Sequence, residues 1–238
     1  MDGDDVRLEL EGGWIQYSDF LYREVAGRVL EFRPAAGTQI VRLTSENARA
    51  LEHLTGIIND LQATVRYCIV YESSFESALD PAVQDALWKA ALVTYARCFE
   101  AGVRKSERPD LSVLDDLGDA RKAHEYFMTL RSKYVAHSVN ALEMNMTYAL
   151  LTNDRGETVV ARGPGTFQIS SNPLNEQGSN TLKRLAETLL HQAQERHGSL
   201  SEAVMDELHD MSQEELLALP VITSHVAPDV ASMRQTRR

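Results

Sequence analysis

The sequence predicts a mainly α fold, an antiparallel four-helix bundle with a β-hairpin inserted between the third and fourth long helices. Apolar residues recur at helical spacing in four long stretches, which begin near residues 45, 81, 120 and 181. Between the last two stretches the apolar residues recur with a period of two, which is typical of strands. The chain has 238 residues, of which 43% are hydrophobic, so it can bury a substantial core.

Residues 1–43 form a predicted N-terminal extension of short strands and turns. Trp14–Tyr17 and Val29–Phe32 are short apolar segments bounded by turn residues, and an extended segment, Gln39–Leu43, follows the second of them. A short helix over residues 18–28 is the competing interpretation.

The helical bundle is expected to span residues 44–197, and its first two helices have clear start signals. Thr44 or Ser45 can cap a helix that runs to about Tyr71, because a hydroxyl at this position accepts a hydrogen bond from a free backbone N–H. Asp80-Pro81 combines an N-cap residue with proline at the first helical position, and the second helix is expected to reach about Arg104.

A β-hairpin is predicted at about residues 143–170. Met144–Leu150 alternates apolar and polar residues, Thr158–Ala161 reads as the returning strand, and the turn residues between them favour a hairpin. Gly163-Pro164-Gly165 is expected to break the second strand, after which Thr166–Ser170 can form a third.

The fourth long helix is predicted from Thr181 to about His197, with Asn180 as its cap and Gly198 as its end. Residues 198–238 are expected to form short helices followed by a mobile tail. One of these helices begins at a capping box, Ser212-Gln213-Glu214-Glu215.

Composition and charge limit the classes of function. The formal net charge of −11 argues against a protein that coats nucleic acid non-specifically, although it permits a local basic pocket. The sequence contains no apolar run long enough to cross a membrane, and its acidic start is unlike a signal peptide. Cys68 and Cys98 lie in apolar helical patterns, which favours buried thiols in a reducing cytoplasm. No Cys/His cluster has metal-binding spacing, and we expect no cofactor.

The stretch Leu130–Asn140 carries the most suggestive chemistry. It closes the third helix, which Asp119 is expected to cap, and it contains Arg131 and His137. Arginine offers a fork of donors that matches phosphate oxygens, and histidine exchanges protons near neutral pH. Together they can support attack of an RNA 2′-hydroxyl on its own phosphate. The structural alternative is an exposed arginine and a helix-end histidine that only support packing. His124 is a rival acid–base candidate, because it lies seven residues before Arg131.

This stretch resembles the Arg-x(4–6)-His signature of the HEPN superfamily, whose members are small helical bundles that include many RNases. The form here is Arg131-x5-His137, and its context is similar to the RNK-x-x-AH variant of the family. Thr94–Phe99, followed by Gly102 and Arg104, also resembles helix sequence of such proteins. The resemblance covers residues from about 45 to 195.

The resemblance implies a metal-independent endoribonuclease of toxin or phage-defence type. His137 would act as general base or acid and Arg131 would neutralise the scissile phosphate. Ser132, Asn140 and Glu143 would support the catalytic residues. Lys133 and Arg97 would contact the RNA. RNA would be the substrate, and an antitoxin protein is a possible partner.

A homodimer with the active site at its interface is expected both from the resemblance and from geometry. Six residues on an ideal helix separate two side chains by about 120°, so one copy places Arg131 and His137 poorly around one phosphate.

Two departures from the family pattern keep other functions open. Ser132 stands where members often carry Asn, Asp or His, and Val139 stands where antitoxin-paired members often carry Tyr. A non-catalytic nucleotide- or RNA-binding protein, or an interaction scaffold, is therefore the alternative function. Arg97 likewise has a structural alternative, as an ion-pair partner of nearby carboxylates.

Overall fold

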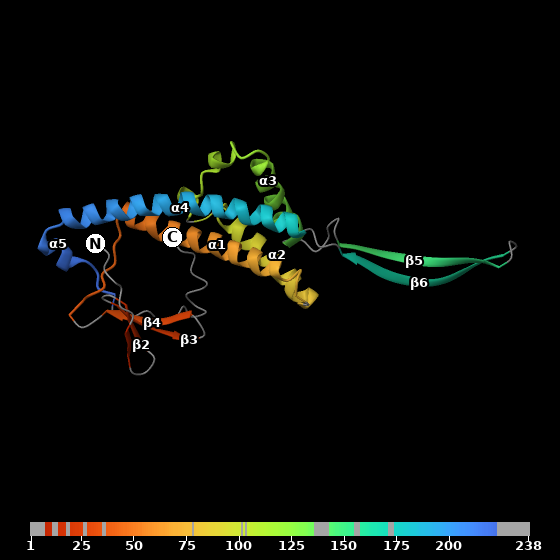
Figure 1. Ribbon diagram of the computed structural model, residues 1–238, viewed down its shortest axis with the longest axis horizontal. Coiled ribbons are helices and arrows are strands. Elements are labelled where there is room, and N and C mark those ends of the chain that lie inside the picture. The colour runs from red at the N-terminus through yellow and green to blue at the C-terminus, as the bar shows by residue number, and fades with distance from the viewer. Residues whose placement is uncertain are drawn as a thin grey trace. The chain divides into compact units, whose positions relative to one another are not determined.

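The computed structural model describes residues 8–10, 14–17, 20–25, 28–34, 37–77, 79–100, 102, 104–135, 143–154, 158–170 and 174–222. In this part the chain is mainly helical, with a two-stranded hairpin between the third and fourth long helices (Figure 1), and this coarse prediction is confirmed. The chain divides into two compact units, one of Met1–Arg49 with Leu200–Arg238 and one of Ala50–Ser199.

The first unit contains a four-stranded antiparallel meander of order β1-β2-β3-β4. Its strands are β1 (Leu8–Leu10), β2 (Trp14–Tyr17), β3 (Phe20–Val25) and β4 (Arg28–Pro34). Strands were expected at the positions of β2 and β4. The alternative of a helix over residues 18–28 is wrong, because β3 occupies most of this range. Its aromatic and branched residues favour an extended chain.

The expected strand at Gln39–Leu43 is reduced to one β-bridge between Val41 and Val221. The backbone N–H of Arg42 donates to the carbonyl of Pro220 at 2.8 Å. Helix α5 (Gln213–Ala218) precedes this bridge, and its predicted capping box is present. Glu215 accepts from the N–H of Ser212 at 2.8 Å, and Ser212 Oγ accepts from the N–H of Glu215 at 3.3 Å.

Helices α1 (Glu46–Ser73) and α2 (Pro81–Arg97) are antiparallel neighbours, and their predicted start signals are in use. Ser45 Oγ accepts from the N–H of Ala48 at 3.1 Å, and the Asp80 carboxylate accepts from the N–H of Ala82 at 2.7 Å. Near the end of α2, the hydroxyls of Thr64 and Thr94 share a hydrogen bond of 2.9 Å. The core between the helices is apolar. Its fully buried members include Leu54, Ile57, Leu61, Ala91, Leu92 and Tyr95.

Helix α2 ends at Arg97 rather than at the predicted Arg104. The last turn tightens, since the N–H groups of Cys98 and Phe99 donate to carbonyls three residues back, those of Tyr95 and Ala96. This tightening takes Phe99 out of the helix and places its ring 4.6 Å from that of His124. Aromatic packing with the third helix thus accompanies the end of α2.

The connection from α2 to the third helix contains two short 3₁₀ turns, η2 (Lys105–Glu107) and η3 (Leu111–Leu114). Helix α3 (Ala120–Leu130) follows, and the chain continues as a π-helical turn, η4 (Arg131–Val135). Asp119 precedes α3 as predicted but makes no capping hydrogen bond. Its carboxylate instead accepts from Lys122 Nζ at 2.8 Å, so the first turn is stabilised by an exposed ion pair.

Helix α4 runs without interruption from Glu176 to Asp210, well beyond the predicted Thr181–His197. Asn175, rather than Asn180, supplies the side chain at its start, where Oδ1 accepts from the N–H of Gly178 at 2.7 Å. The apolar face of α4 is buried as its spacing predicts, through Leu182, Leu185, Ala186, Leu189 and Ala193. In the second unit α4 runs antiparallel to α1, because Lys183 pairs with Glu72 and His197 lies 3.2 Å from Thr55.

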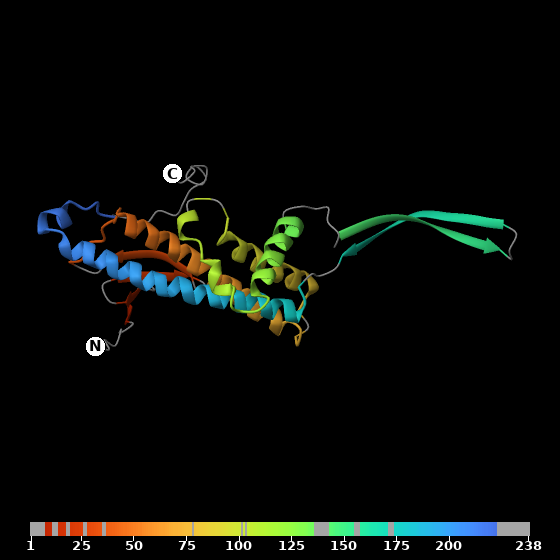
Figure 2. The same ribbon diagram turned by 90° about the horizontal axis from the view of Figure 1, so that it is seen from above.

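The hairpin consists of β5 (Glu143–Asp154) and β6 (Thr158–Ser170), which lie side by side along their length (Figure 2). The expected break at Gly163-Pro164-Gly165 is wrong, and Thr166–Ser170 continues β6 rather than forming a third strand. Tyr148 pairs with Gly165 and Leu150 with Arg162, so β6 has one extra residue at this point. The bulge accommodates Pro164, which has no N–H to donate to β5.

Gly198 offers a test of the uninterrupted α4. A Cβ built at Gly198 meets no atom within 4 Å, and its φ is not left-handed. Gly198→Ala should therefore raise the free energy of unfolding, by up to about 1 kcal/mol, because alanine favours the helix. Gly118→Ala is the contrasting variant, since Gly118 has φ +63° and alanine is strained there. Urea unfolding of both proteins measures the difference. A destabilised Gly198→Ala protein would contradict a continuous helix.

Candidate functional site

Arg131 lies where the third helix changes its geometry. The α-helical hydrogen bonds end at Leu130, and Arg131–Val135 form a wider π turn. Such turns are rare and often occur at functional sites. The expected divergence of Arg131 and His137 by about 120° assumes an α-helix through both residues. That assumption is wrong for Arg131–Val135, so the geometric argument for a dimer loses its basis.

The guanidinium of Arg131 forms an ion pair with Glu100, which follows the end of α2. The side chain of Arg131 is 32% exposed and that of Glu100 is 40% exposed. An ion pair with this much contact with water contributes about 1 kcal/mol or less. Arg131 is therefore paired, but its partner is one that a phosphate group can replace at small cost.

A second ion cluster lies at the same end of α2. The carboxylate of Asp60, on α1, is buried between Arg104 (Nη1–Oδ2, 2.8 Å) and Arg97 (Nη1–Oδ1, 3.5 Å). Arg97 forms the ion pair of its structural interpretation, although its side chain remains 47% exposed. One carboxylate between two arginines leaves one positive charge uncompensated.

Gly56 makes room for this cluster on α1. A Cβ at position 56 would lie 3.0 Å from Cζ of Arg104. The guanidinium therefore packs directly against the helix backbone at a position where a side chain would displace it. This close approach explains a glycine in the interior of a long helix, where it otherwise weakens the helix.

The two clusters meet through the end of α2, because Arg97 and Glu100 are three residues apart in the chain. We name Arg97, Arg104 and Arg131 the arginine cluster. With Asp60 and Glu100 counted, its net charge is 3 − 2 = +1, in a chain whose net charge is −11. The net charge of the chain permits a local basic site, and this cluster is weakly basic.

The rings of Tyr95, Phe99 and His124 hold α2 against α3 beside the cluster. The hydroxyl of Tyr95 and Nδ1 of His124 share a hydrogen bond of 2.9 Å, and His124 is buried. Burial lowers the pKa of His124, and the charge of Arg121 lowers it further against the opposing charge of Glu125. His124 is accordingly neutral at pH 7 and enclosed, so the structure gives it a packing role rather than the rival acid–base role.

The structure describes only some of the other predicted site residues. Ser132 and Lys133 are exposed in the π turn. Glu143 is the first residue of β5 and pairs with Ser170. His137 and Asn140 lie outside the described residues. Among the described residues, the structure thus joins Arg131 to Glu100 and Arg97 to Asp60.

Sequence reasoning overlooked Asp60 and Glu100. Asp60 carries a signal, because a carboxylate lies among the apolar residues of the α1 stripe, three residues after Ile57 and one before Leu61. A charge on a buried face requires a partner. Glu100 carries no such signal, since its partner Arg131 lies 31 residues further along the chain.

The two cysteines are buried, as predicted, and chemically inert. Burial raises the pKa of Cys68 and that of Cys98 to about 12. Cys98 also lies near Asp60, whose charge raises its pKa further, while Arg104 and Arg97 lower it. Neither thiol is a nucleophile at neutral pH.

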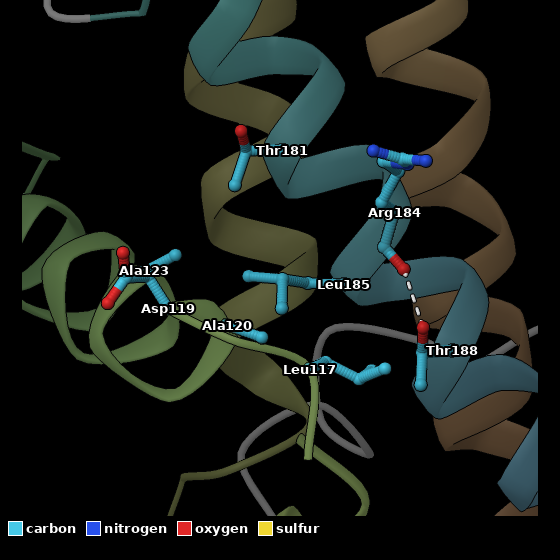
Figure 3. A pocket seen from close by; sticks show the side chains of 8 residues that line it. All are labelled: Leu117, Asp119, Ala120, Ala123, Thr181, Arg184, Leu185 and Thr188. Carbon is cyan, nitrogen blue, oxygen red and sulfur yellow. Dashed lines mark hydrogen bonds between the residues drawn. The ribbon is translucent and has the colours of Figure 1, made fainter. Parts of the chain in front are cut away.

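A separate cavity of about 610 Å³ lies between the start of α3 and α4 (Figure 3). Leu117, Ala120, Ala123 and Leu185 give it an apolar wall. The polar residues along it are Asp119, Thr181, Arg184 and Thr188. The Asp119 carboxylate is already bound by Lys122. None of the predicted site residues lines this cavity, and it contains no pair of acid and base.

Comparison with known proteins leaves the site to be judged on its own chemistry. The chain matches no family model, no curated protein and no solved structure. Within the described residues, no group of three or more His, Cys, Asp or Glu side chains could hold a metal ion. No helix in that part of the chain is long and apolar enough to cross a membrane.

The buried His124 predicts a pH dependence of stability. Its pKa lies below the ordinary value of 6.5 in the folded chain, so the unfolded chain binds the proton more readily, and stability falls as the pH drops below about 6.5. His124→Phe leaves the Tyr95 hydroxyl unpaired and should cost about 1–3 kcal/mol at neutral pH. The gap between wild type and variant should narrow at about pH 5.5, measured by urea unfolding. A constant gap would mean that His124 does not titrate differently in the two states.

Proposed function

We propose that the chain is a metal-independent endoribonuclease that cleaves RNA by attack of a 2′-hydroxyl on the adjacent phosphate. The observation that carries the proposal is the position of Arg131. It begins a π turn, it is half-exposed, and its carboxylate partner is exchangeable. The Arg131-x5-His137 motif supplies the other half of the chemistry.

The reaction needs a proton acceptor, a proton donor and compensation of negative charge. His137 removes the proton of the 2′-hydroxyl or donates one to the leaving 5′-oxygen. The bond from phosphorus to that oxygen breaks as the new one forms, and the products end in a 2′,3′-cyclic phosphate and a 5′-hydroxyl. Arg131 leaves Glu100 and binds the phosphate through its two-donor fork.

The other motif residues take positioning roles in this proposal. Ser132 hydrogen-bonds near the phosphate, while Asn140 and Glu143 orient His137 or the RNA. Lys133 and Arg97 contact the flanking backbone of the RNA. The exposure of Ser132, Lys133 and Arg97 supports these roles, since all three side chains are open to solvent.

We further propose that α1, α2, α3 and α4 form a four-helix bundle of HEPN type and that two copies assemble into a homodimer. The active cleft then lies at the interface, where two copies supply two His137 and two Arg131 side chains. Doubling the arginines matters because the chain as a whole, at −11, repels phosphate. The setting that fits is a cytoplasmic toxin or phage-defence effector, with an antitoxin protein as a possible partner.

One observation favours a second candidate, a non-catalytic RNA- or nucleotide-binding protein or an interaction scaffold. Every described arginine of the cluster is engaged by a carboxylate. In that case Arg131 holds the π turn against the end of α2, and its loss affects stability rather than cleavage. The variants below separate these candidates.

Substitution of His137 tests the chemistry. Wild-type protein should cut RNA in the presence of EDTA, and His137→Ala should lower the rate by about 10²- to 10⁴-fold, the usual effect of losing a proton-transfer group. His191→Ala is the matched control, because His191 is exposed on α4 and pairs only with Glu195 in the described part of the chain. Equal rates for wild type and His137→Ala would remove His137 from the mechanism.

Arg131 and Glu100 test the exchange of partners. Arg131→Lys keeps the charge but loses the two-donor fork, so cleavage should fall by about tenfold or more. Glu100→Gln removes the carboxylate that pairs with Arg131, so RNA should bind more tightly. The gain in binding free energy should be no larger than that of an exposed ion pair, about 1 kcal/mol or less. Filter binding and single-turnover cleavage measure both effects. The scaffold alternative predicts instead that the wild-type protein cleaves no RNA and that both variants unfold more easily.

A further inference from the structure

A second cavity, of about 240 Å³, lies between α1, α4 and the connection from α2 to α3. All of its lining residues belong to the second compact unit. Leu54 of α1, Pro109 of the connection and Ala193 of α4 are buried and give it apolar walls. The other lining residues are polar, namely Glu107, Arg108, Asp110, Gln192 and Arg196. We name this space the connection cavity.

Hydrogen bonds tie the connection to α4 at the edge of the cavity. The backbone N–H of Asp110 donates to Oε1 of Gln192 at 3.0 Å, and Nε2 of Gln192 donates to the Asp110 carbonyl at 3.2 Å. The Asp110 carboxylate accepts from the N–H and the hydroxyl of Ser112, at 2.9 and 2.5 Å. The cavity is therefore formed by fixed elements before any ligand binds.

Glu107 holds one arginine at the cavity. Its side chain is only 7% exposed, and it forms an ion pair with Arg196, whose side chain is 46% exposed. A buried carboxylate requires a charged partner, so Glu107 fixes the position of Arg196. A guanidinium has five donors, and the exposed part of Arg196 leaves donors for a ligand.

Two buried polar atoms of the lining residues have no hydrogen bond within the described part of the chain. They are Nε of Arg108, which is a donor, and Oε2 of Glu107, which is an acceptor. A buried polar atom without a hydrogen bond is costly. A ligand that suits this wall therefore carries acceptors and donors together, rather than one kind alone.

Charge divides the region into a neutral cavity and a basic surrounding. Arg108 and Arg196 face Glu107 and Asp110 around the cavity, so the lining has a net charge of 2 − 2 = 0. Arg104, a member of the arginine cluster, precedes Glu107 by three residues, and their Cα atoms are thus at most about 11 Å apart. The exposed Lys105 lies between them and adds a positive charge to the cluster.

This combination fits one nucleotide unit of single-stranded RNA. A nucleobase is uncharged, has acceptors and donors on its edge and is apolar on its two faces, whereas its phosphate is negative. Proteins that read RNA sequence bind unstacked bases by hydrogen bonds to the edge and by contact with the faces. The neutral cavity matches the base, and the arginine cluster beside it matches the phosphates.

We propose that the connection cavity receives one base of an RNA strand whose phosphates lie at the arginine cluster. Arg108 and Arg196 donate to acceptors of the base, and Glu107 accepts from its donors. The cavity is several times larger than the roughly 30 Å³ of one water and smaller than the roughly 300–1,000 Å³ of drug-sized ligand sites. It therefore accommodates one ring system rather than a whole nucleotide. The choice of RNA as the ligand rests on the proposed function, which this site would make dependent on base identity.

Binding without cleavage tests the site. A fluorescent 2′-O-methyl RNA decamer of mixed sequence lacks the attacking hydroxyl, and an abasic decamer offers the same phosphates without bases. In fluorescence anisotropy, wild type should bind the decamer with bases about tenfold or more tightly than the abasic one. Equal affinity for the two decamers, or binding of neither, would overturn the proposal.

A charge-neutral double variant assigns this preference to the cavity. Glu107→Gln with Arg196→Gln removes both charges and leaves no buried carboxylate unpaired. The preference for bases should fall to about twofold or less, with the affinity for the abasic decamer unchanged. Asp119→Asn with Lys122→Gln is the matched control, because it removes an exposed ion pair elsewhere, and it should keep the preference. A Glu107/Arg196 variant that keeps it too would refute the assignment.

Photo-cross-linking of wild type keeps the test decisive if the double variant fails to fold. A 2′-O-methyl decamer containing 4-thiouridine should cross-link to peptides that contain residues 105–110 or 192–196. Cross-links found only in other peptides would contradict the proposal. A mixture of the four nucleoside monophosphates should displace the decamer poorly, and displacement as strong as that by unlabelled decamer would assign the cavity to free nucleotides instead of RNA.

The outcome is distinguishable from that of the proposed function. Cleavage of ordinary RNA by wild type, without any preference for bases in binding, leaves the nuclease proposal standing and removes the base site. A base preference that the Glu107/Arg196 variant loses, in a protein that cleaves no RNA, leaves the base site standing and removes the nuclease.

Discussion

The buried carboxylate of Asp60 is the interaction on which the arrangement around Arg131 depends. A charge removed from water must be paired, and removing one partner of such a pair usually costs several kcal/mol. Arg97 and Arg104 supply that pairing from either side of the turn that follows α2. Glu100, which binds Arg131, lies between these two arginines in the chain. Gly56 belongs to the same constraint, since it admits Arg104 to the surface of α1.

This dependence gives the arginine cluster two different kinds of member. Arg104 and Arg97 neutralise a carboxylate that cannot leave, so their positions are set by folding. Arg131 is bound to a carboxylate that remains in contact with water, so its position is set by competition with solvent and ligands. The cluster thus holds one arginine that can exchange its partner and two whose partner is buried. This arrangement suits recognition of an anion, because Arg97 and Arg104 attract the anion and Arg131 can bind it.

Local signals in the sequence predicted the parts of the fold that local hydrogen bonds decide. Ser45, Asp80 and Ser212 each cap the helix that follows them, because the donor and acceptor lie within a few residues. The helix ends were predicted less well. Gly198 did not end α4, and α2 stopped short of Gly102, where aromatic packing with His124 accompanies its end. The partner of Arg131 was invisible for a related reason, since Glu100 lies 31 residues away in the chain.

The bulge in β6 makes the two edges of the hairpin unequal. Pro164 has no N–H and Arg162 is charged, and both features protect an edge strand from adding a further strand. β5 has neither protection, since its residues 144–153 lack proline, glycine and charge. Such segments are prone to aggregate when their backbone is exposed. The edge of the hairpin that is open to pairing with a further strand is therefore β5 rather than β6.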